Sequence, residues 1–379
     1  MPNEQILQNR YEIIQVLRIG GMGTIYLGVD RRLGIKVAIK EFSLISEDKL
    51  DSEIFRNAFA DECQILAALS HHGIPKATDF FRVAGKDYFV MEFIGGSDLD
   101  KIIRRQNDHF NLNLVLDWFL QMLDIVEYLH TLPQPVFHRD LKPSNFKLTV
   151  DGKIKLLDFG IAKSTFNQNF IANKSLNIAT FEFAPLEQLI KASSHVKNSL
   201  VFLNATKALE LLETKTSAST DIFALGATLY QLLTNCLPPD AHVRALAVWS
   251  GKLDPILPLT SYDRDIPADL EIAVLQSLSL IPSDRPRSVK KLRNLISVFY
   301  VANIKTPVAS HATPVTTLSH QTPRNPKSWE VPLTRNLNTS PNRFPVKRTA
   351  QTFFNIYQKR FRNDSSNDRK TENLENLLY

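Results

Sequence analysis

Cysteine is scarce in this chain of 379 residues, which contains only two. Cys63 and Cys236 each lie in an apolar stretch with a helical pattern, far apart in the sequence. Two such residues argue against a disulfide framework and against a cysteine-rich zinc site. The sequence therefore indicates a protein of a reducing compartment.

The sequence also shows no targeting segment at its start and no long apolar run. Residues 1–4 read Met-Pro-Asn-Glu and lack the basic and apolar regions of a signal peptide. No uninterrupted apolar stretch approaches the length that spans a bilayer. We therefore expect a soluble, cytoplasmic protein.

Positive charge is concentrated at one end of the chain. The formal net charge is +6, but residues 301–379 hold 12 Lys and Arg against 5 Asp and Glu. Residues 1–300 hold 33 basic and 34 acidic side chains and are close to neutral. If the protein binds an acidic protein, a membrane surface or a nucleic acid through charge, we expect the C-terminal segment to make that contact.

The composition changes at about residue 303 to that of a disordered tail. Residues 303–379 contain seven prolines, many Thr, Ser and Asn, and scattered Lys and Arg. Their one aromatic and basic patch covers residues 349–361. This patch fits a docking peptide, a segment that touches a membrane or nucleic acid, or a marginal helix lying on its own domain.

The preceding 300 residues carry regular hydrophobic patterns. Apolar and β-branched residues recur at period two in residues 11–17, 24–29 and 36–42, which predicts strands. Apolar residues recur at helical spacing in residues 55–69 and 111–130, which predicts amphipathic helices. With 44% apolar residues, the chain can bury a sizeable core.

The most informative stretch, residues 137–160, reads F-H-R-D-L-K-P-S-N-F-K-L-T-V-D-G-K-I-K-L-L-D-F-G. It matches the H-R-D-L-x-x-x-N and D-F-G motifs on either side of a predicted β-hairpin. A turn with capping residues would match one motif by chance, but two motifs at this spacing favour function. The chain resembles the eukaryotic-type (Hanks-type) protein kinases, and Asp140-Leu-Lys142-Pro is similar to their serine/threonine form. Residues 21–26 and 221–228 resemble the bacterial branch, notably the cyanobacterial type.

This resemblance implies the bilobal protein kinase fold, of class α+β. Residues 1–10 are then an N-terminal extension, and residues 11–94 form a β-rich N-lobe with helix αC. Residues 95–302 form a mainly helical C-lobe, which carries an insertion at residues 189–220. Apolar residues at 200–203 and 208–212 predict a short packed helix in that insertion.

The resemblance also implies an ATP site. Residues 18–23, Arg-Ile-Gly-Gly-Met-Gly, resemble the glycine-rich loop that covers the phosphates, and residues 37–40 resemble the strand whose lysine holds them. Glu62 stands where the family's αC glutamate pairs with Lys40. Main-chain groups of residues 92–94 are expected to bond the adenine edge. The implied nucleotide-binding residues are Ile19, Gly20, Gly21, Gly23, Ile25, Ala38, Lys40, Met91, Glu92, Ile94 and Lys147.

The same resemblance assigns the chemistry of phosphoryl transfer to a protein Ser or Thr. Asp140 is expected to accept or orient the proton of the substrate hydroxyl, with Lys142 against the transferring phosphate. Asn145 and Asp158 are expected to hold Mg²⁺, with Mn²⁺ as an alternative, because such ions prefer oxygen ligands. The protein is expected to autophosphorylate and to act in bacterial signalling.

Regulatory and structural residues follow from the segments after the D-F-G motif. Arg139 precedes the catalytic aspartate, the arrangement that accompanies control by a phosphate on residues 161–179, and Ser175 is the candidate acceptor, with Ser164 and Thr165 behind it. Residues 179–188 are similar to the family's peptide-binding segment and keep its threonine and glutamate. The residues expected to regulate or brace the site are Arg139, Ser175, Thr180, Glu187, Asp221 and Arg285, the last pairing with Glu187.

Two basic residues depart from the family pattern. Arg18 replaces the first loop glycine, which would stiffen the loop or add a phosphate contact. Lys147 replaces an apolar residue beneath the adenine, where its stem can pack with the ammonium turned outward. These departures favour a pseudokinase scaffold, whereas the intact Lys40, Asp140 and Asp158 favour an active kinase. A small-molecule kinase on the same fold is a third reading, which the Lys142-Pro143 form disfavours.

Overall fold

The computed structural model describes residues 5–20, 23–42, 60, 63–106, 108–158, 178–262 and 265–304. For residues 178–180 and 301–304 it describes the backbone alone. Several predictions made above therefore lie outside the described residues: Gly21, Glu62, Ser164, Thr165, Ser175 and the tail from residue 305 onward, together with the side chain of Thr180.

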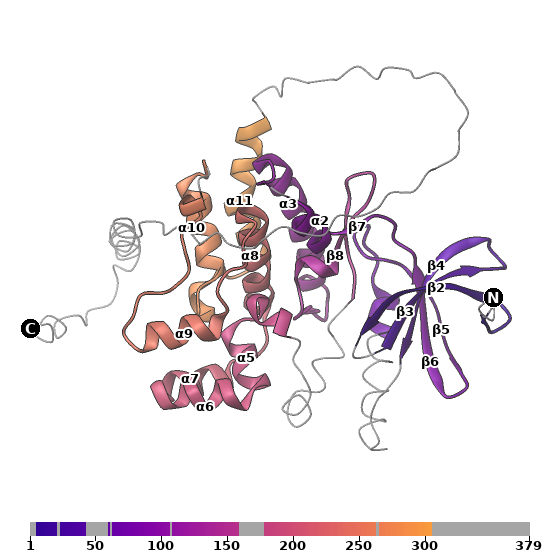
Figure 1. Cartoon of the computed structure of the whole chain (residues 1–379), viewed down its shortest axis with the longest axis horizontal. Coiled ribbons are helices and arrows are strands. Elements are labelled where there is room, and N and C mark those ends of the chain that lie inside the picture. The colour runs from indigo at the N-terminus through magenta and orange to yellow at the C-terminus, as the bar shows by residue number, and fades with distance from the viewer. Residues whose placement is uncertain are drawn as a thin grey trace, which may run out of the picture. The chain divides into compact units, whose positions relative to one another are not determined.

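An antiparallel sheet of six strands forms the N-terminal region, with the order β1-β2-β3-β4-β6-β5 (Figure 1). Its core contains Tyr11, Ile39, Tyr88 and Val90, which are buried because alternate side chains of each strand face the same side. The strands are β1 (Ile6–Leu7), β2 (Tyr11–Gly20), β3 (Gly23–Asp30), β4 (Ile35–Phe42), β5 (Ala77–Val83) and β6 (Lys86–Glu92).

Helices make up most of the described residues that follow the sheet (Figure 1). They are α2 (Leu99–Arg105), α3 (Leu112–His130), α5 (Leu186–Ala192), α6 (Ser194–Leu203), α7 (Ala205–Glu213), α8 (Ala218–Thr234), α9 (Ala241–Trp249), α10 (Ala268–Ser277) and α11 (Val289–Ile304). Among the described residues, 3₁₀ turns cover Pro143–Asn145, Ile178–Phe183, Leu259–Tyr262 and Pro282–Asp284. None of the described helices is both long enough and apolar enough to cross a bilayer.

Helix α8 is the central element of the helical region. Every residue from Thr220 to Thr234 is buried, and α3, α10 and α11 all pack against this helix. A helix that is apolar all round is stable only inside a core. The polar groups near its N-terminus are therefore held at fixed positions in the interior.

A small sheet packs against α2 and α3 at the start of the helical region. Its strands are β7 (Ser97–Asp98), β8 (Phe146–Leu148) and β9 (Ile154–Leu156), all antiparallel. Gly96 enters it with a φ of +112°, and a Cβ at this position would lie 2.1 Å from the carbonyl oxygen of Leu148. Only glycine fits so close a backbone approach.

The insertion between α5 and α8 forms two helices, α6 and α7, rather than the single short helix expected. The side chain of Asn204 accepts a hydrogen bond from the backbone of Lys207 and caps α7, so the chain turns there and starts a new helix. Val196, Leu200, Ala208 and Leu211 are buried, and α6 packs against α5 and α9. The insertion is therefore part of the helical core.

Candidate active site

Three polar side chains meet in the loop between α3 and β8. Asp140 is buried, and its Oδ1 lies 3.0 Å from Lys142 Nζ. Asn145 Nδ2 donates to the Asp140 backbone oxygen at 2.8 Å and to Oδ2 at 3.2 Å. The 3₁₀ turn Pro143–Asn145 brings Asn145 back onto Asp140, since Pro143 presets its first backbone angle. One carboxylate is thus contacted by one cation and one amide.

This loop is fixed to α8 through Asp221. The carboxylate of Asp221 accepts the backbone N–H groups of His138 and Arg139, both at 2.8 Å, and lies 2.8 Å from His130 Nε2. Burial by itself would raise the pKa of Asp221, but the hydrogen bond and charge of His130, with the charge of His138 and the Arg139 N–H, outweigh it and lower that pKa. Asp221 therefore stays ionised and holds the loop.

Arg139 has a left-handed backbone, with a φ of +65°, directly after its own anchored amide. Its backbone oxygen accepts Gln188 Nε2 at 2.9 Å, which ties the loop to α5. Burial lowers the pKa of Arg139, and the charge of Asp221 opposes that shift. The predicted partner of its guanidinium, a phosphate on Ser175, lies outside the described residues.

The six-stranded sheet carries several residues that the sequence analysis assigns to the nucleotide site. Lys40 lies on β4 opposite Ile25 of β3 and faces a small cavity of about 20 Å³ that Met91 and Asp158 also line, with Leu66, Pro75, Phe89, Leu156 and Leu157. Gly23 has a φ of +141°, and a Cβ there would lie 1.9 Å from the Glu41 carbonyl oxygen. Strand packing therefore requires glycine at this position whether or not a nucleotide binds.

Lys147 is directed at the connecting segment and does not extend into solvent. On β8 it lies opposite Asp98 of β7, and its side chain is 17% exposed. Nζ donates to the carbonyl oxygen of Ile94 at 3.3 Å and lies 3.6 Å from Asp98 Oδ1. The sequence analysis expected the ammonium to turn outward, whereas Ile94 and Asp98 hold it within the structure.

Arg18 and Asp158 form an ion pair that sequence reasoning missed. Arg18 NH1 lies 2.9 Å from Asp158 Oδ2, although the residues are separated by 140 positions. Asp158 has a φ of +50°, so its backbone is in the left-handed region. No periodicity or motif in the sequence signals a contact between side chains so far apart.

The donor set at Asn145 and Asp158 fits a hard divalent cation. The amide nitrogen of Asn145 is used by Asp140, which leaves Oδ1 as the oxygen donor of that side chain. Asp158 supplies carboxylate oxygens, and such oxygen ligands are those that Mg²⁺ prefers.

Glu187 and Arg285 form a buried, two-point ion pair, with NH1–Oε1 at 2.7 Å and NH2–Oε2 at 2.9 Å. The remaining N–H groups of Arg285 bond the backbone oxygens of Ser279, Ser219 and Leu280. All five of its donors are therefore satisfied within the protein.

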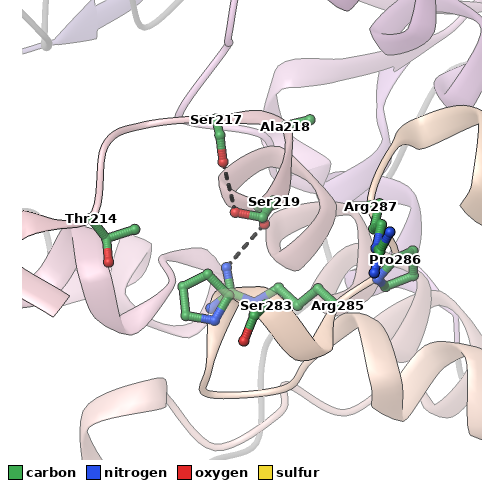
Figure 2. Close-up of a pocket in the computed structure, with 9 residues that line it drawn as sticks. Thr214, Ser217, Ala218, Ser219, Ser283, Arg285, Pro286 and Arg287 are labelled. Atoms are coloured by element: carbon green, nitrogen blue, oxygen red, sulfur yellow. Dashed lines mark hydrogen bonds between the residues drawn. The ribbon is translucent and has the colours of Figure 1, made fainter. Parts of the chain in front are cut away.

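A second cavity, of about 390 Å³, lies beside this ion pair (Figure 2). Its lining comprises Thr214, Ser217, Ala218, Ser219, Pro282, Ser283, Arg285, Pro286 and Arg287. Figure 2 shows Ser217 and Ser219 bonded to each other there. Arg285 has no donor left for a ligand in this cavity, so we interpret its role as structural.

His71, His72 and Asp124 bring three potential metal-ligand atoms within 4.8 Å of one another. The chemistry disfavours a metal, because His71 Nδ1 accepts the Gly73 N–H at 3.0 Å and its Nε2 must then carry the proton that bonds Asp124. Asp124 also pairs with Arg293 at 3.2 Å. This cluster instead attaches the loop before β5 to α3.

The structure thus brings Asp140, Lys142 and Asn145 together, and it anchors Arg139 and Asp221 next to them. Lys40, Met91 and Asp158 share the small cavity, and Lys147 contacts Ile94. Ile19 and Gly20 lie at the end of β2, and Ala38 lies opposite Met91 on the neighbouring strand. The residues that the sequence analysis missed are those whose role is to hold others: His130, Gln188 and Asp98.

Comparisons with known proteins agree with this arrangement. Residues 11–252 match the family model of the protein kinase domain. A probable serine/threonine-protein kinase of Clostridium acetobutylicum is 26% identical over 292 residues, which cover 77% of this chain and 40% of that protein. The serine/threonine-protein kinase PknD of Chlamydia caviae is 30% identical over 302 residues, covering 75% of this chain and 30% of PknD. The chain spans less than half the length of these curated relatives.

Solved structures establish the fold. The apo form of PpkA-294 has a TM-score of 0.60 at 23% identity and covers 78% of this chain and 99% of its own. The PknI kinase domain of Mycobacterium tuberculosis has a TM-score of 0.55 at 20% identity and covers 79% of this chain and 99% of its own. The predicted bilobal α+β fold and the bacterial serine/threonine-kinase resemblance are therefore confirmed. The chain belongs to the protein kinase domain family, among relatives that are bacterial serine/threonine kinases.

Proposed function

We propose that this chain is an active serine/threonine protein kinase, which transfers the γ-phosphoryl group of ATP to hydroxyls of protein substrates. The proposal rests on the buried carboxylate of Asp140, which Lys142 and Asn145 both contact. A scaffold that binds nucleotide without turnover has no use for a carboxylate held in this way.

Asp140 acts as the proton acceptor. The substrate hydroxyl oxygen attacks the γ-phosphorus while the bond to the β-phosphate oxygen breaks, and the hydroxyl proton passes to the Asp140 carboxylate. Asn145 fixes the orientation of this carboxylate through two hydrogen bonds. Lys142, 3.0 Å from Oδ1, supplies positive charge where the phosphoryl group crosses.

Lys40 holds the α- and β-phosphates, and Ala38, Met91 and the backbone of residues 92–94 contact the adenine. Asn145 Oδ1 and the Asp158 carboxylate hold the divalent cation, for which we propose Mg²⁺. When bound, this cation neutralises charge on the β- and γ-phosphates. Glu62, which lies outside the described residues, is proposed to pair with Lys40 and orient it.

We further propose that the protein works in the cytoplasm in bacterial signalling and autophosphorylates, with Ser175 as a regulatory acceptor whose phosphate Arg139 would bind. The free cysteines among the described residues are consistent with a reducing compartment. The basic tail is proposed as the part that contacts an acidic protein, a membrane surface or a nucleic acid.

The test is autophosphorylation with labelled ATP and Mg²⁺, comparing wild type with Asp140→Asn. Because proton transfer by a positioned carboxylate contributes about 10² to 10⁴ in rate, we expect labelling to fall by at least a hundredfold while nucleotide binding persists. Asp151→Asn, at an exposed turn between β8 and β9, is the matched control and should label like wild type. Unchanged labelling in Asp140→Asn would refute the mechanism, and ATP binding without labelling in wild type would favour the scaffold.

A further inference from the structure

Arg18 forms an ion pair with the Asp158 carboxylate, which the proposed mechanism assigns to the divalent cation. Its guanidinium lies 2.9 Å from Asp158 Oδ2, and within the described ranges this is the ion pair that Asp158 forms. Arg18 stands where the family has the first glycine of its phosphate-covering loop. A glycine there cannot reach Asp158, so the contact is a property of this chain.

The two sides of this contact have different alternative partners. The carboxylate oxygens of Asp158 are ligands that a divalent metal ion needs. The Arg18 guanidinium, already bound to Oδ2, competes with a metal ion for them. Arg18 has a planar fork of N–H donors that matches a phosphate as well as it matches a carboxylate. Both side chains are partly exposed, and exposed pairs change an equilibrium constant by only a few-fold. The pair is therefore weak enough to be exchanged.

We propose that Arg18 is a positioning residue that exchanges partners: it neutralises Asp158 in the nucleotide-free protein and moves to the nucleotide's phosphates when the metal–nucleotide complex enters. This inference rests on the proposed function. It makes Arg18 oppose the binding of a metal ion alone and favour the binding of metal and nucleotide together. The chain thereby discriminates between the free metal and its nucleotide complex before any chemistry occurs.

Two binding measurements test the exchange without relying on turnover. The affinity for Mn²⁺ alone and for the Mn²⁺ complex of a non-hydrolysable ATP analogue are measured for wild type and Arg18→Met. We expect the variant to bind Mn²⁺ alone about two- to fivefold more tightly, because the competing cation is gone. We expect it to bind the complex about two- to fivefold more weakly, because a phosphate contact is lost.

Arg31→Met is the matched control, since Arg31 is a similarly exposed arginine in the turn that follows β3, and it lies 3.7 Å from Glu12. It should leave both affinities unchanged. Arg18→Lys keeps the positive charge but lacks the planar set of guanidinium N–H donors. We expect both of its affinities to lie between those of wild type and Arg18→Met. Thermal melts of all variants verify that each one folds.

Opposite shifts in the two affinities support the exchange, and unchanged affinities for Arg18→Met overturn it. If Arg18→Met binds both Mn²⁺ alone and the Mn²⁺–nucleotide complex more tightly, the proposed contact between Arg18 and the phosphates is overturned. Arg18 would then only compete with the metal ion for Asp158. Opposite shifts in a protein that labels no substrate would uphold the exchange and refute the proposed kinase activity. An active kinase whose Arg18→Met variant binds both ligands like wild type would uphold the proposed kinase activity and refute the exchange.

Discussion

Arginine meets a carboxylate at two places around this site, once inside the helical core and once where the sheet faces it. Arg285 and Glu187 are 0% and 3% exposed, whereas Arg18 and Asp158 are 50% and 29% exposed. The shortest contacts are similar, at 2.7 Å and 2.9 Å. Distance alone therefore does not distinguish the two pairs, but their surroundings do.

The buried pair cannot lose one member without leaving a charge in the core. Water is able to replace either member of the exposed pair at little cost. The same division runs through the whole site. The loop that contains Asp140 is anchored to α8 by buried groups, whereas Arg18 at the end of β2 is held by an exchangeable pair. The residue proposed to accept the proton thus stands on a rigid base, and the residue proposed to contact the phosphates does not.

The largest expected effect comes from breaking the buried pair. Arg285→Met removes a charge while keeping much of the side-chain volume, and it leaves the Glu187 carboxyl in the core without its ion-pair partner. Breaking such a pair costs about 3–5 kcal/mol, which lowers the Tm of a domain this size by about 10 °C. Thermal and urea unfolding measure the loss.

Arg18→Met is the matched exposed substitution and should cost less than about 1 kcal/mol. Equal losses for Arg285→Met and Arg18→Met would contradict the contrast between the pairs. A Glu187→Gln and Arg285→Met double-mutant cycle then isolates the coupling between the two side chains.

A smaller effect on stability, with a larger one on turnover, is expected for Asp221→Asn. The amide keeps the shape but turns an NH₂ group toward at least one of the three donors that the carboxylate accepts. Leaving a buried donor unsatisfied costs about 1–3 kcal/mol. Because the displaced donors belong to the catalytic loop, kcat should fall while the KM for ATP changes little. A lowered stability with an unchanged kcat would show that the loop keeps its geometry without this anchor.

The smallest expected effect is a dependence of stability on pH that arises at His71. Burial lowers the pKa of His71 below its usual 6.5, so the unfolded chain binds a proton more readily than the folded one. The free energy of unfolding should therefore fall as pH drops through 6.5, and it should be unaffected by this residue above that pH. His71→Asn should make that fall shallower without removing it, since burial also lowers the pKa of His242. An equally steep fall in His71→Asn would exclude His71 as a source.

Much of the fold could be predicted from the sequence because the spacing of apolar residues differs between strands and helices. The helix expected at residues 111–130 is α3, with Asn111 as its cap, and the strands expected at residues 11–42 are β2, β3 and β4. The insertion was harder, because a cap at Asn204 divides it and nothing in the apolar pattern marks that division.

The candidate site was readable only where a residue carries its own signature. Asp140, Asn145 and Asp158 were located by motif, although their catalytic roles stay predictions. The pair of Arg18 with Asp158 and that of Lys147 with Asp98 depend on which side chains meet across the fold. That information is absent from any single stretch of sequence, since each partner alone would pass for a solvated charge.

The backbone contact at Gly96 has a mechanical consequence. Because this residue touches the backbone of Leu148, the chain beyond it moves as one piece with β8 and with the loop that precedes β8. Glu92 is still paired with Val37 in the large sheet, so any turning between the two lobes falls to residues 93–95, where Gly95 has no neighbour within 4 Å of where its Cβ would be. A nucleotide bonded to residues 92–94 would rest on the pivot itself. Its base would then be displaced least, and its phosphates most, whenever the cleft opens.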